Sequence, residues 1–244
     1  MMQTTSADYS QKPTKRANQD DLIYEQMFSA ILEQKLTPGT KLSEDVLGEI
    51  FGVSRTIIRK VLQRLAYEKV VCIRPNRGAF VAEPTPDEAK DVFEARRVVE
   101  TGIIRNVVQR HNPAHVQELE TMLTAEAASI AKGAHSQWVA LSGDFHMVLA
   151  RISGNRSLEE FLKELVSRTS LIHVQYQSNK IGPQTCSCDE HADIIEAIRA
   201  QDEEKAVELM LAHLNGIEKG LNLDGTDPVS DLYEIFGGKP QSGF

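Results

Sequence analysis

The spacing of apolar residues predicts helices over most of the chain. From residue 87 onward, apolar side chains recur every three or four positions, which is the period of an amphipathic helix. The pattern breaks at Asn112-Pro113, Gly133, Gly154-Asn155, Gly182-Pro183 and Asp202. The expected helices cover residues 87–110, 113–132, 136–153, 157–179, 189–201 and 203–221, with 228–236 as a candidate for a short seventh. No useful period-two alternation interrupts them, so an all-α bundle of six or seven helices is expected.

Two short helices joined by a tight turn are predicted between residues 43 and 67, after a scaffold helix from residue 20 or 21 to about 31. Ser43 is placed as the N-cap of the first, and Gly52 allows the turn. Ser54 is a second N-cap, for a helix that runs to about residue 67. The apolar residues of the first short helix are expected to face inward: Val46, Leu47 and Ile50.

A basic hairpin follows the second short helix. Residues 70–73 and 79–81 are predicted as strands, joined by a loop with the sequence Arg-Pro-Asn-Arg-Gly at 74–78. Arg55 and Arg59 lie four residues apart, on a face of the preceding helix different from its apolar stripe. A helix-turn-helix followed by a basic hairpin is a winged helix-turn-helix, whose second helix enters the DNA major groove while the wing approaches the backbone or minor groove.

The chain is therefore expected to be mainly α, with two domains. We predict a flexible arm over 1–20, a winged helix-turn-helix domain over 21–82, a proline-containing linker at 83–86, a helical domain over 87–236 and a tail at 237–244.

Charge is distributed unevenly between these regions. The chain carries a net charge of −8, yet residues 1–82 hold 12 Lys and Arg against 9 Asp and Glu, whereas residues 83–244 hold 15 against 26. A weakly basic DNA-binding domain favours a dimer. The three cysteines, an odd number, argue against a disulfide framework. We expect a cytoplasmic protein with no membrane partner, because no apolar run approaches the roughly 20 residues of a membrane span and no secretory segment is present.

The N-terminal part resembles the GntR family of bacterial transcription regulators. The resemblance lies in the segments Pro38–Glu44, Gly52–Arg59 and Arg77–Val81. It departs from the family pattern at residues 57–58, 60–61 and near Lys69. The resemblance implies a DNA-binding regulator rather than an enzyme. The expected DNA contacts come from the second helix and the wing: Ser54, Arg55, Thr56, Arg59, Arg77 and Gly78.

The C-terminal part is similar to the effector-binding (FCD) domain of the FadR subfamily of these regulators. The matching segments are 93–100, 144–146 leading to 153–155, 190–191 with 197–198, and 210–214. This resemblance implies a homodimer that binds double-stranded operator DNA and responds to a small organic acid.

Three histidines, His146, His191 and His213, fall on three separate predicted helices. Taken singly, each is more readily explained as a satisfied core or interfacial histidine. Subfamily members, however, often bind a divalent metal through three histidines in these segments. They usually add Asp or Asn four residues before the first, where this chain has Ser142. Three neutral imidazoles suit zinc or nickel better than calcium or magnesium.

Arg96 lies in the middle of a predicted apolar helix face. A buried guanidinium needs an anionic partner, and two are considered equally: Glu100, one turn on, or the carboxylate of a bound ligand. Arg96 and Ser142 are therefore the predicted effector-binding residues. Trp138 lies two turns before His146, and a core position is favoured for it over a cavity lining.

Three functions fit these residues. The first is a ligand-responsive transcription regulator of a metabolic operon, with a divalent metal in its helical pocket. The second is a metal-dependent, hydrolase-like enzyme, since three histidines with an open position also describe catalytic zinc sites. The third is a regulator whose pocket holds no metal.

Overall fold

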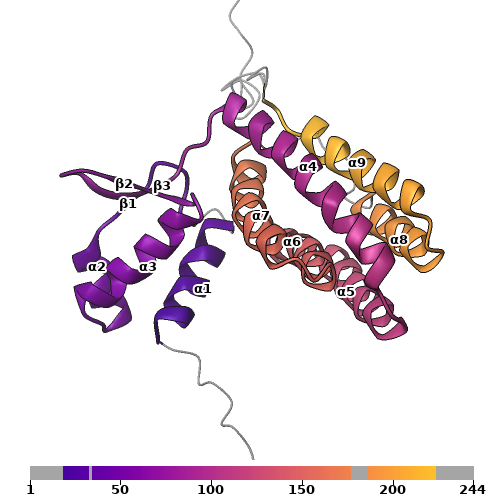
Figure 1. Cartoon of the computed structure of the whole chain (residues 1–244). Helices are drawn as coiled ribbons and strands as arrows, with labels where there is room; N and C mark the ends of the chain where they lie inside the picture. The colour runs from indigo at the N-terminus through magenta and orange to yellow at the C-terminus, as the bar shows by residue number, and fades with distance from the viewer. Residues whose placement is uncertain (1–18, 33–34, 177–185, 224–244) are drawn as a thin grey trace, which may run out of the picture.

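The computed structural model describes residues 19–32, 35–176 and 186–223. These residues form an N-terminal winged unit and a larger helical unit that lie side by side (Figure 1). The predicted arm at 1–20, the candidate helix at 228–236 and the tail fall wholly or mostly outside the described residues. Among the described helices, none is both long enough and apolar enough to span a bilayer.

The winged unit combines three helices with a three-stranded sheet. The helices are α1 (Gln19–Leu32), α2 (Glu44–Phe51) and α3 (Arg55–Tyr67), and the strands are β1 (Lys41–Leu42), β2 (Val71–Arg74) and β3 (Gly78–Val81). The antiparallel sheet has the order β1-β3-β2. The β2–β3 hairpin is the predicted wing. The short strand β1, which pairs with β3, was not predicted, because two residues are too few for a recognisable alternation.

The tight turn between α2 and α3 is built as the sequence indicates. Gly52 ends α2 in the left-handed conformation, with φ at 64°, which glycine adopts without steric cost. Ser43 and Ser54 occupy the N-cap positions of α2 and α3, but neither side chain makes a capping hydrogen bond. The hydroxyl of Ser54 therefore stays available to another partner.

The predicted inward face of α2 was wrong at two of three positions. Val46 is 53% exposed and Ile50 is 68% exposed, whereas Leu47 packs against the core of the winged unit. Gly48 is the buried residue of this helix, and the ideal position of a Cβ on it lies 3.1 Å from the carbonyl oxygen of Val53. Because Gly48 has no Cβ, the helix can pack its backbone closely against the turn at this position. This packing turns Val46 and Ile50 toward solvent.

Six helices form the second unit within the described residues, in agreement with the lower predicted number. They are α4 (Pro86–Arg110), α5 (Pro113–Ala131), α6 (His135–Ile152), α7 (Arg156–Tyr176), α8 (Cys186–Arg199) and α9 (Glu203–Lys219). Their starts are encoded locally. Thr85 and Glu88 form a capping box before α4, and the side chains of Asn112 and Asp202 cap α5 and α9.

Side-chain contacts join the two units beyond the chain connection at Pro84. Leu171 of α7 packs into the core of the winged unit. Glu68, buried just after α3, pairs with Lys163 of α7 at 3.0 Å. Leu32 of α1 forms a small apolar cluster with Val139 of α6 and Val174 of α7. The position of the winged unit therefore depends directly on helices α6 and α7.

Candidate functional site

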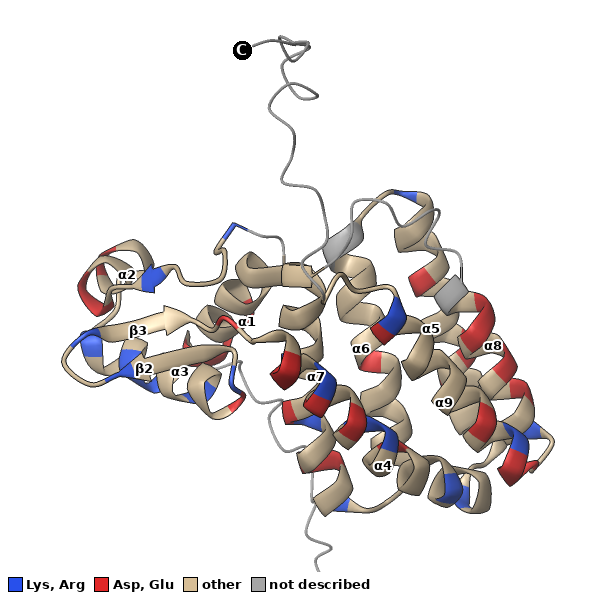
Figure 2. Ribbon diagram, turned by 90° about the horizontal axis from the view of Figure 1, so that it is seen from above, with Lys and Arg blue, Asp and Glu red and all other residues tan. Residues whose placement is uncertain are grey.

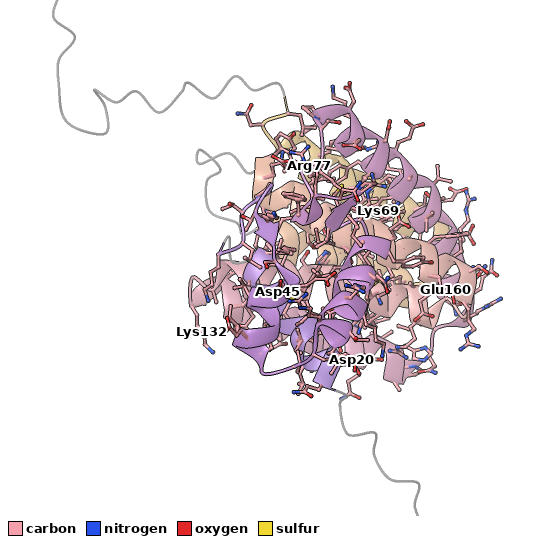
Figure 3. The ribbon with its side chains drawn as sticks, turned by 90° about the vertical axis from the view of Figure 1, so that its left-hand side faces the viewer. Asp20, Asp45, Lys69, Arg77, Lys132 and Glu160 are labelled. Atoms are coloured by element: carbon pink, nitrogen blue, oxygen red, sulfur yellow. The ribbon has the colours of Figure 1, made fainter. Side chains whose placement is uncertain are left out.

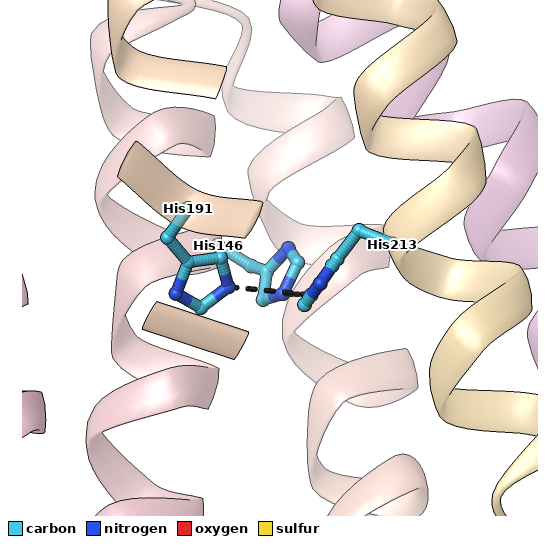
Figure 4. A group of neighbouring side chains, drawn as sticks. All are labelled: His146, His191 and His213. Carbon is cyan, nitrogen blue, oxygen red and sulfur yellow. Dashed lines mark hydrogen bonds between the residues drawn. The ribbon is translucent and has the colours of Figure 1, made fainter. Parts of the chain in front are cut away.

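Three buried histidines meet in the interior of the helical unit. His146 comes from α6, His191 from α8 and His213 from α9, and each is at most 2% exposed. The Nε2 atom of His213 lies 3.2 Å from that of His191 and 3.3 Å from that of His146. Figure 4 shows the three rings turned toward one another from their separate helices. The sequence-predicted set is thus brought together by the fold.

Each of these rings is held from behind by a carboxylate. His146 Nδ1 lies 2.5 Å from Glu100, His191 Nδ1 lies 2.8 Å from Glu126, and His213 Nδ1 lies 2.7 Å from Glu190. An ionised carboxylate only accepts hydrogen bonds, so each Nδ1 carries the proton and donates it. The unprotonated Nε2 lone pairs then face the common centre. This carboxylate–histidine arrangement is the usual support of a metal-binding imidazole.

The buried surroundings favour the neutral form of His146 and His213. Burial lowers the pKa of His146 to about 3, despite the opposing effect of Glu100. Burial likewise lowers the pKa of His213. For Glu100, burial alone would raise the pKa, but the Arg96 guanidinium and His146 bring it down to about 2. A neutral imidazole beside an ionised carboxylate is the state in which histidine binds a metal.

The residues fit a divalent metal. The ligand atoms of the three histidines all lie within 4.8 Å of one another. A tetrahedral zinc ion with Zn–N bonds of about 2.05 Å places two imidazole nitrogens about 3.3 Å apart, which matches the two Nε2 separations. Within the described part of the chain, no further histidine, cysteine or carboxylate joins this set. Asp144 lines a separate pocket beside α1, as its position two residues from His146 indicated.

A cavity of about 60 Å³ adjoins His146. Arg96 and Ser142, the predicted effector-binding residues, both line it, together with Trp138. The prediction that Trp138 is core was therefore incomplete. The other lining residues are mostly small or apolar: Val139, Gly143, Val166, Thr169, Ser170, His173 and Ile217.

Arg96 satisfies only part of its hydrogen-bonding capacity. Its Nε donates to Glu100 at 2.7 Å, and the residue is 2% exposed. Its Nη2 is buried and has no hydrogen-bond partner among the residues that the structure describes. Both anionic partners expected from the sequence are therefore compatible with the structure. Glu100 accepts from Nε of Arg96, and Nη2 is left to donate to the carboxylate of a ligand. A buried, unpaired donor of this kind is costly unless an acceptor binds it.

The predicted DNA-contacting residues all lie exposed on the winged unit: Ser54, Arg55, Thr56, Arg59, Arg77 and Gly78. Figure 3 looks onto this unit and places Arg77 of the wing and Asp45 of α2 on the side facing the viewer. Basic positions gather on α3 and the hairpin, whereas acidic positions follow α8 and α9 (Figure 2). The uneven charge inferred from composition is therefore also uneven in space.

Both reading-helix arginines contact acidic residues of α2. Arg59 donates to Glu44 through Nε at 3.0 Å and through Nη2 at 2.7 Å. Arg55 contacts Asp45. The side chains of Arg55 and Arg59 nonetheless remain 70% and 60% exposed. The surface is thus open to a duplex.

The sequence reasoning missed the carboxylates behind the histidines. Glu126 was not singled out, because it lies 65 residues from His191 and no spacing rule links them. Glu190 was noted only as the neighbour of His191, whereas it supports His213 instead. A buried glutamate on an apolar helix face, as at Glu100 and Glu126, was the available signal.

Comparison with known proteins agrees with both halves of this description. The family described as "Bacterial regulatory proteins, gntR family" matches residues 20–81, and the FCD domain family matches residues 91–216. The HTH-type transcriptional repressor RspR of Escherichia coli is 25% identical over 210 residues, covering 86% of this chain and 90% of RspR. The repressor NanR of an Enterobacter species is 26% identical, covering 88% and 90% of the two chains.

Solved structures share the fold. Escherichia coli McbR/YncC superposes with a TM-score of 0.71 at 20% identity, over 84% of this chain and 99% of that one. A GntR regulator from Rhodococcus sp. RHA1 gives 0.72 at 21% identity, over 86% and 99%. The named relatives are transcriptional regulators and not enzymes, which counts against the hydrolase reading. Each domain is matched by one of the two families, and the FCD match covers more than half of the 244-residue chain. The chain therefore belongs to the GntR family of bacterial transcription regulators and carries an FCD domain.

Proposed function

We propose that this regulator belongs to the FadR subfamily, holds a divalent metal in its helical domain, and adjusts operator binding in response to a small organic acid. The observation that carries the proposal is the meeting of three Nε2 lone pairs beside a cavity that also holds an unpaired arginine donor. His146, His191 and His213 would hold the metal, with zinc or nickel suited to this donor set. The bound metal would supply an electrophilic position for one ligand oxygen.

The proposed effector is a short carboxylic acid. One carboxylate oxygen would accept from Nη2 of Arg96, for which the described part of the chain offers no acceptor. Ser142 would add a hydroxyl in the place where subfamily members usually carry Asp or Asn. A cavity of about 60 Å³ holds only a few non-hydrogen atoms, so the acid must be small or the cavity must open on binding.

The proposed DNA complex is that of a homodimer on a pseudo-palindromic operator. Arg55 and Arg59 would contact base edges or phosphates, Ser54 and Thr56 would contact phosphates, and Arg77 and Gly78 would place the wing. Two winged units are expected because one carries few net positive charges. A regulator that binds the bacterial chromosome works in the cytoplasm.

Trp138 is the proposed link between the pocket and the winged unit. Its Nε1 donates to Glu126 at 3.1 Å, and the same carboxylate holds His191. Its ring packs on the cluster of Leu32, Val139 and Val174, in which Leu32 belongs to α1. These contacts connect the histidine cluster with helix α1 of the winged unit. We propose that ligand binding is coupled to the position of the winged unit through them, in addition to the proline-containing linker. Either sign of coupling is compatible with the geometry.

Metal analysis and a ligand screen test the sensor half of the proposal. The purified protein, loaded with zinc and desalted, should retain about one equivalent per chain, because three preformed imidazoles bind zinc tightly. A panel of short mono- and dicarboxylic acids is then screened by thermal unfolding, and a bound acid at a hundred times its Kd stabilises the protein by about 2.7 kcal/mol. Arg96→Met should abolish that stabilisation. Retention of less than about half an equivalent would instead favour a metal-free pocket.

The DNA half is tested with a duplex selected from a randomised pool. Binding is measured by fluorescence anisotropy for the wild type, R55A and R59A, with R151A as the control. Arg151 is an exposed arginine of the helical domain, so R151A removes the same charge away from the reading helix. R55A and R59A should each weaken binding about tenfold or more. Equal affinities for all four proteins would mean that α3 is not the reading helix.

A further inference from the structure

The two arginines of α3 are held in different ways. Arg59 is bound edge-on by Glu44, because Nε and Nη2 each donate to a different carboxylate oxygen, at 3.0 and 2.7 Å. Arg55 forms an ion pair with Asp45 through Nε, and both of these side chains are more than half exposed. Glu44, by contrast, is only 32% exposed. The guanidinium of Arg59 is therefore fixed in plane and direction by two hydrogen bonds to one carboxylate, whereas Arg55 has, among the described residues, an ion pair to a more exposed carboxylate.

The fixed guanidinium keeps the donors that a base edge requires. A guanidinium has five N–H donors in a planar fork, and the carboxylate of Glu44 occupies only the side formed by Nε and Nη2. The Nη1 group and the remaining Nη2 hydrogen are not engaged by Glu44. Guanine offers two acceptors, N7 and O6, on its major-groove edge, which is the pairing that arginine makes most often.

The negative charge of Glu44 also changes which DNA group Arg59 prefers. Phosphate attracts arginine through net charge, and that attraction is weakened when a carboxylate sits directly behind the guanidinium. Hydrogen bonding to a base edge depends on donor direction and is retained. An arginine that is directed but partly neutralised is thus suited to reading sequence, whereas a freer arginine is suited to holding the backbone.

We propose that Glu44 is a positioning residue for DNA recognition, which directs Arg59 onto a guanine edge in each operator half-site. This inference rests on the proposed role of α3 as the reading helix. It assigns a specificity function to a residue of α2, outside the reading helix itself.

The competing explanation is that Glu44 only lowers the local positive charge. Glu49 separates the two, because it is an exposed acid on the same helix and has no ion pair among the described residues. Glu49→Gln removes the same charge as Glu44→Gln and leaves Arg59 in place. A pure charge effect should appear in both variants, and a positioning effect should appear only in the first.

The experiment measures Kd by anisotropy for the selected duplex, for its single-base-pair substitutions and for a scrambled duplex. The proteins are the wild type, E44Q, E49Q and R59A. E44Q should lower the ratio of selected to scrambled affinity about tenfold, with the loss concentrated at the base pair where R59A also loses discrimination. E49Q should leave that ratio unchanged. If E44Q does not fold, E44D provides the same test, since it keeps the negative charge but its carboxylate is one methylene group further from Arg59 and cannot hold the guanidinium in the same position.

Two results would overturn the inference. One is that E44Q and E49Q change the affinities for the selected and the scrambled duplex by the same amount. The other is that E44Q loses discrimination at a base pair that R59A does not affect. Failure of the underlying proposal looks different, because R59A itself would then leave discrimination intact at every base pair.

Discussion

Replacing Glu126 by glutamine should weaken metal binding more than the same change at Glu190. Glu126 is 2% exposed and accepts hydrogen bonds from His191 Nδ1 at 2.8 Å and from Trp138 Nε1 at 3.1 Å. A glutamine side chain has one oxygen and one NH₂ group in the same space. One of the two donors would then face another donor in a buried site, where no water can replace the lost acceptor.

The size of the effect follows from these contacts. Loss of a supporting carboxylate behind a metal-binding histidine typically costs about 10- to 100-fold in metal affinity, or about 1.4 to 2.7 kcal/mol. Glu126→Gln should fall in this range. The Glu190 side chain is 40% exposed, and His213 Nδ1 is the only partner found for it in the described residues. The amide oxygen of Glu190→Gln can still accept from that nitrogen, so its affinity should stay within about threefold of the wild type.

The assay strips each protein with a chelator and titrates zinc back in competition with a chromophoric zinc chelator. Circular dichroism before the titration verifies that each stripped variant is folded. Equal affinities for Glu126→Gln and the wild type, or a larger loss for Glu190→Gln, would refute the assignment of Glu126 as the support of a metal ligand.

Two further outcomes follow from the same core. Acidification from pH 7 to pH 4 should lower the unfolding temperature of the metal-free protein. Burial lowers the pKa of His146 to about 3 and also lowers that of His213, so below pH 6.5 the unfolded chain binds protons that the folded chain does not. The free energy of unfolding therefore decreases as the pH falls below about 6.5. A flat calorimetric profile would contradict this. Trp138 is the only tryptophan in the chain, so its emission should change when zinc binds, and Trp138→Phe should retain zinc but lose any zinc effect on DNA affinity.

Most of the fold could be predicted from the sequence because its helix starts, turns and apolar periodicity are each encoded by residues close together in the chain. The helix starts at Thr85, Asn112 and Asp202 are each encoded within four residues, and the wing is encoded by its basic loop. Which face of a short helix packs against the core was harder to predict from the sequence. In α2, Gly48 rather than Val46 or Ile50 faces the core, since close approach of the backbone decided the rotation.

The site was only partly predictable. Periodicity placed the three histidines on separate helices, but their convergence was inferred from family resemblance. Their supporting carboxylates come from helices far away in sequence, so no local pattern could assign Glu126 to His191. The dual position of Trp138, against both Glu126 and the cluster at Leu32, likewise depends on how α6 packs between two neighbours. Tertiary packing, and not propensity, created these pairings.

We propose that the state of the helical domain sets the affinity of the winged unit for DNA. The most direct measurement is the Kd for the selected duplex in zinc-loaded and chelator-stripped preparations of the wild type, with His213→Ala as a control that cannot complete the site. If metal binding is coupled to DNA binding, the Kd should differ at least about fivefold between the two wild-type states and should not differ for the variant. Identical Kd values in both wild-type states would contradict it.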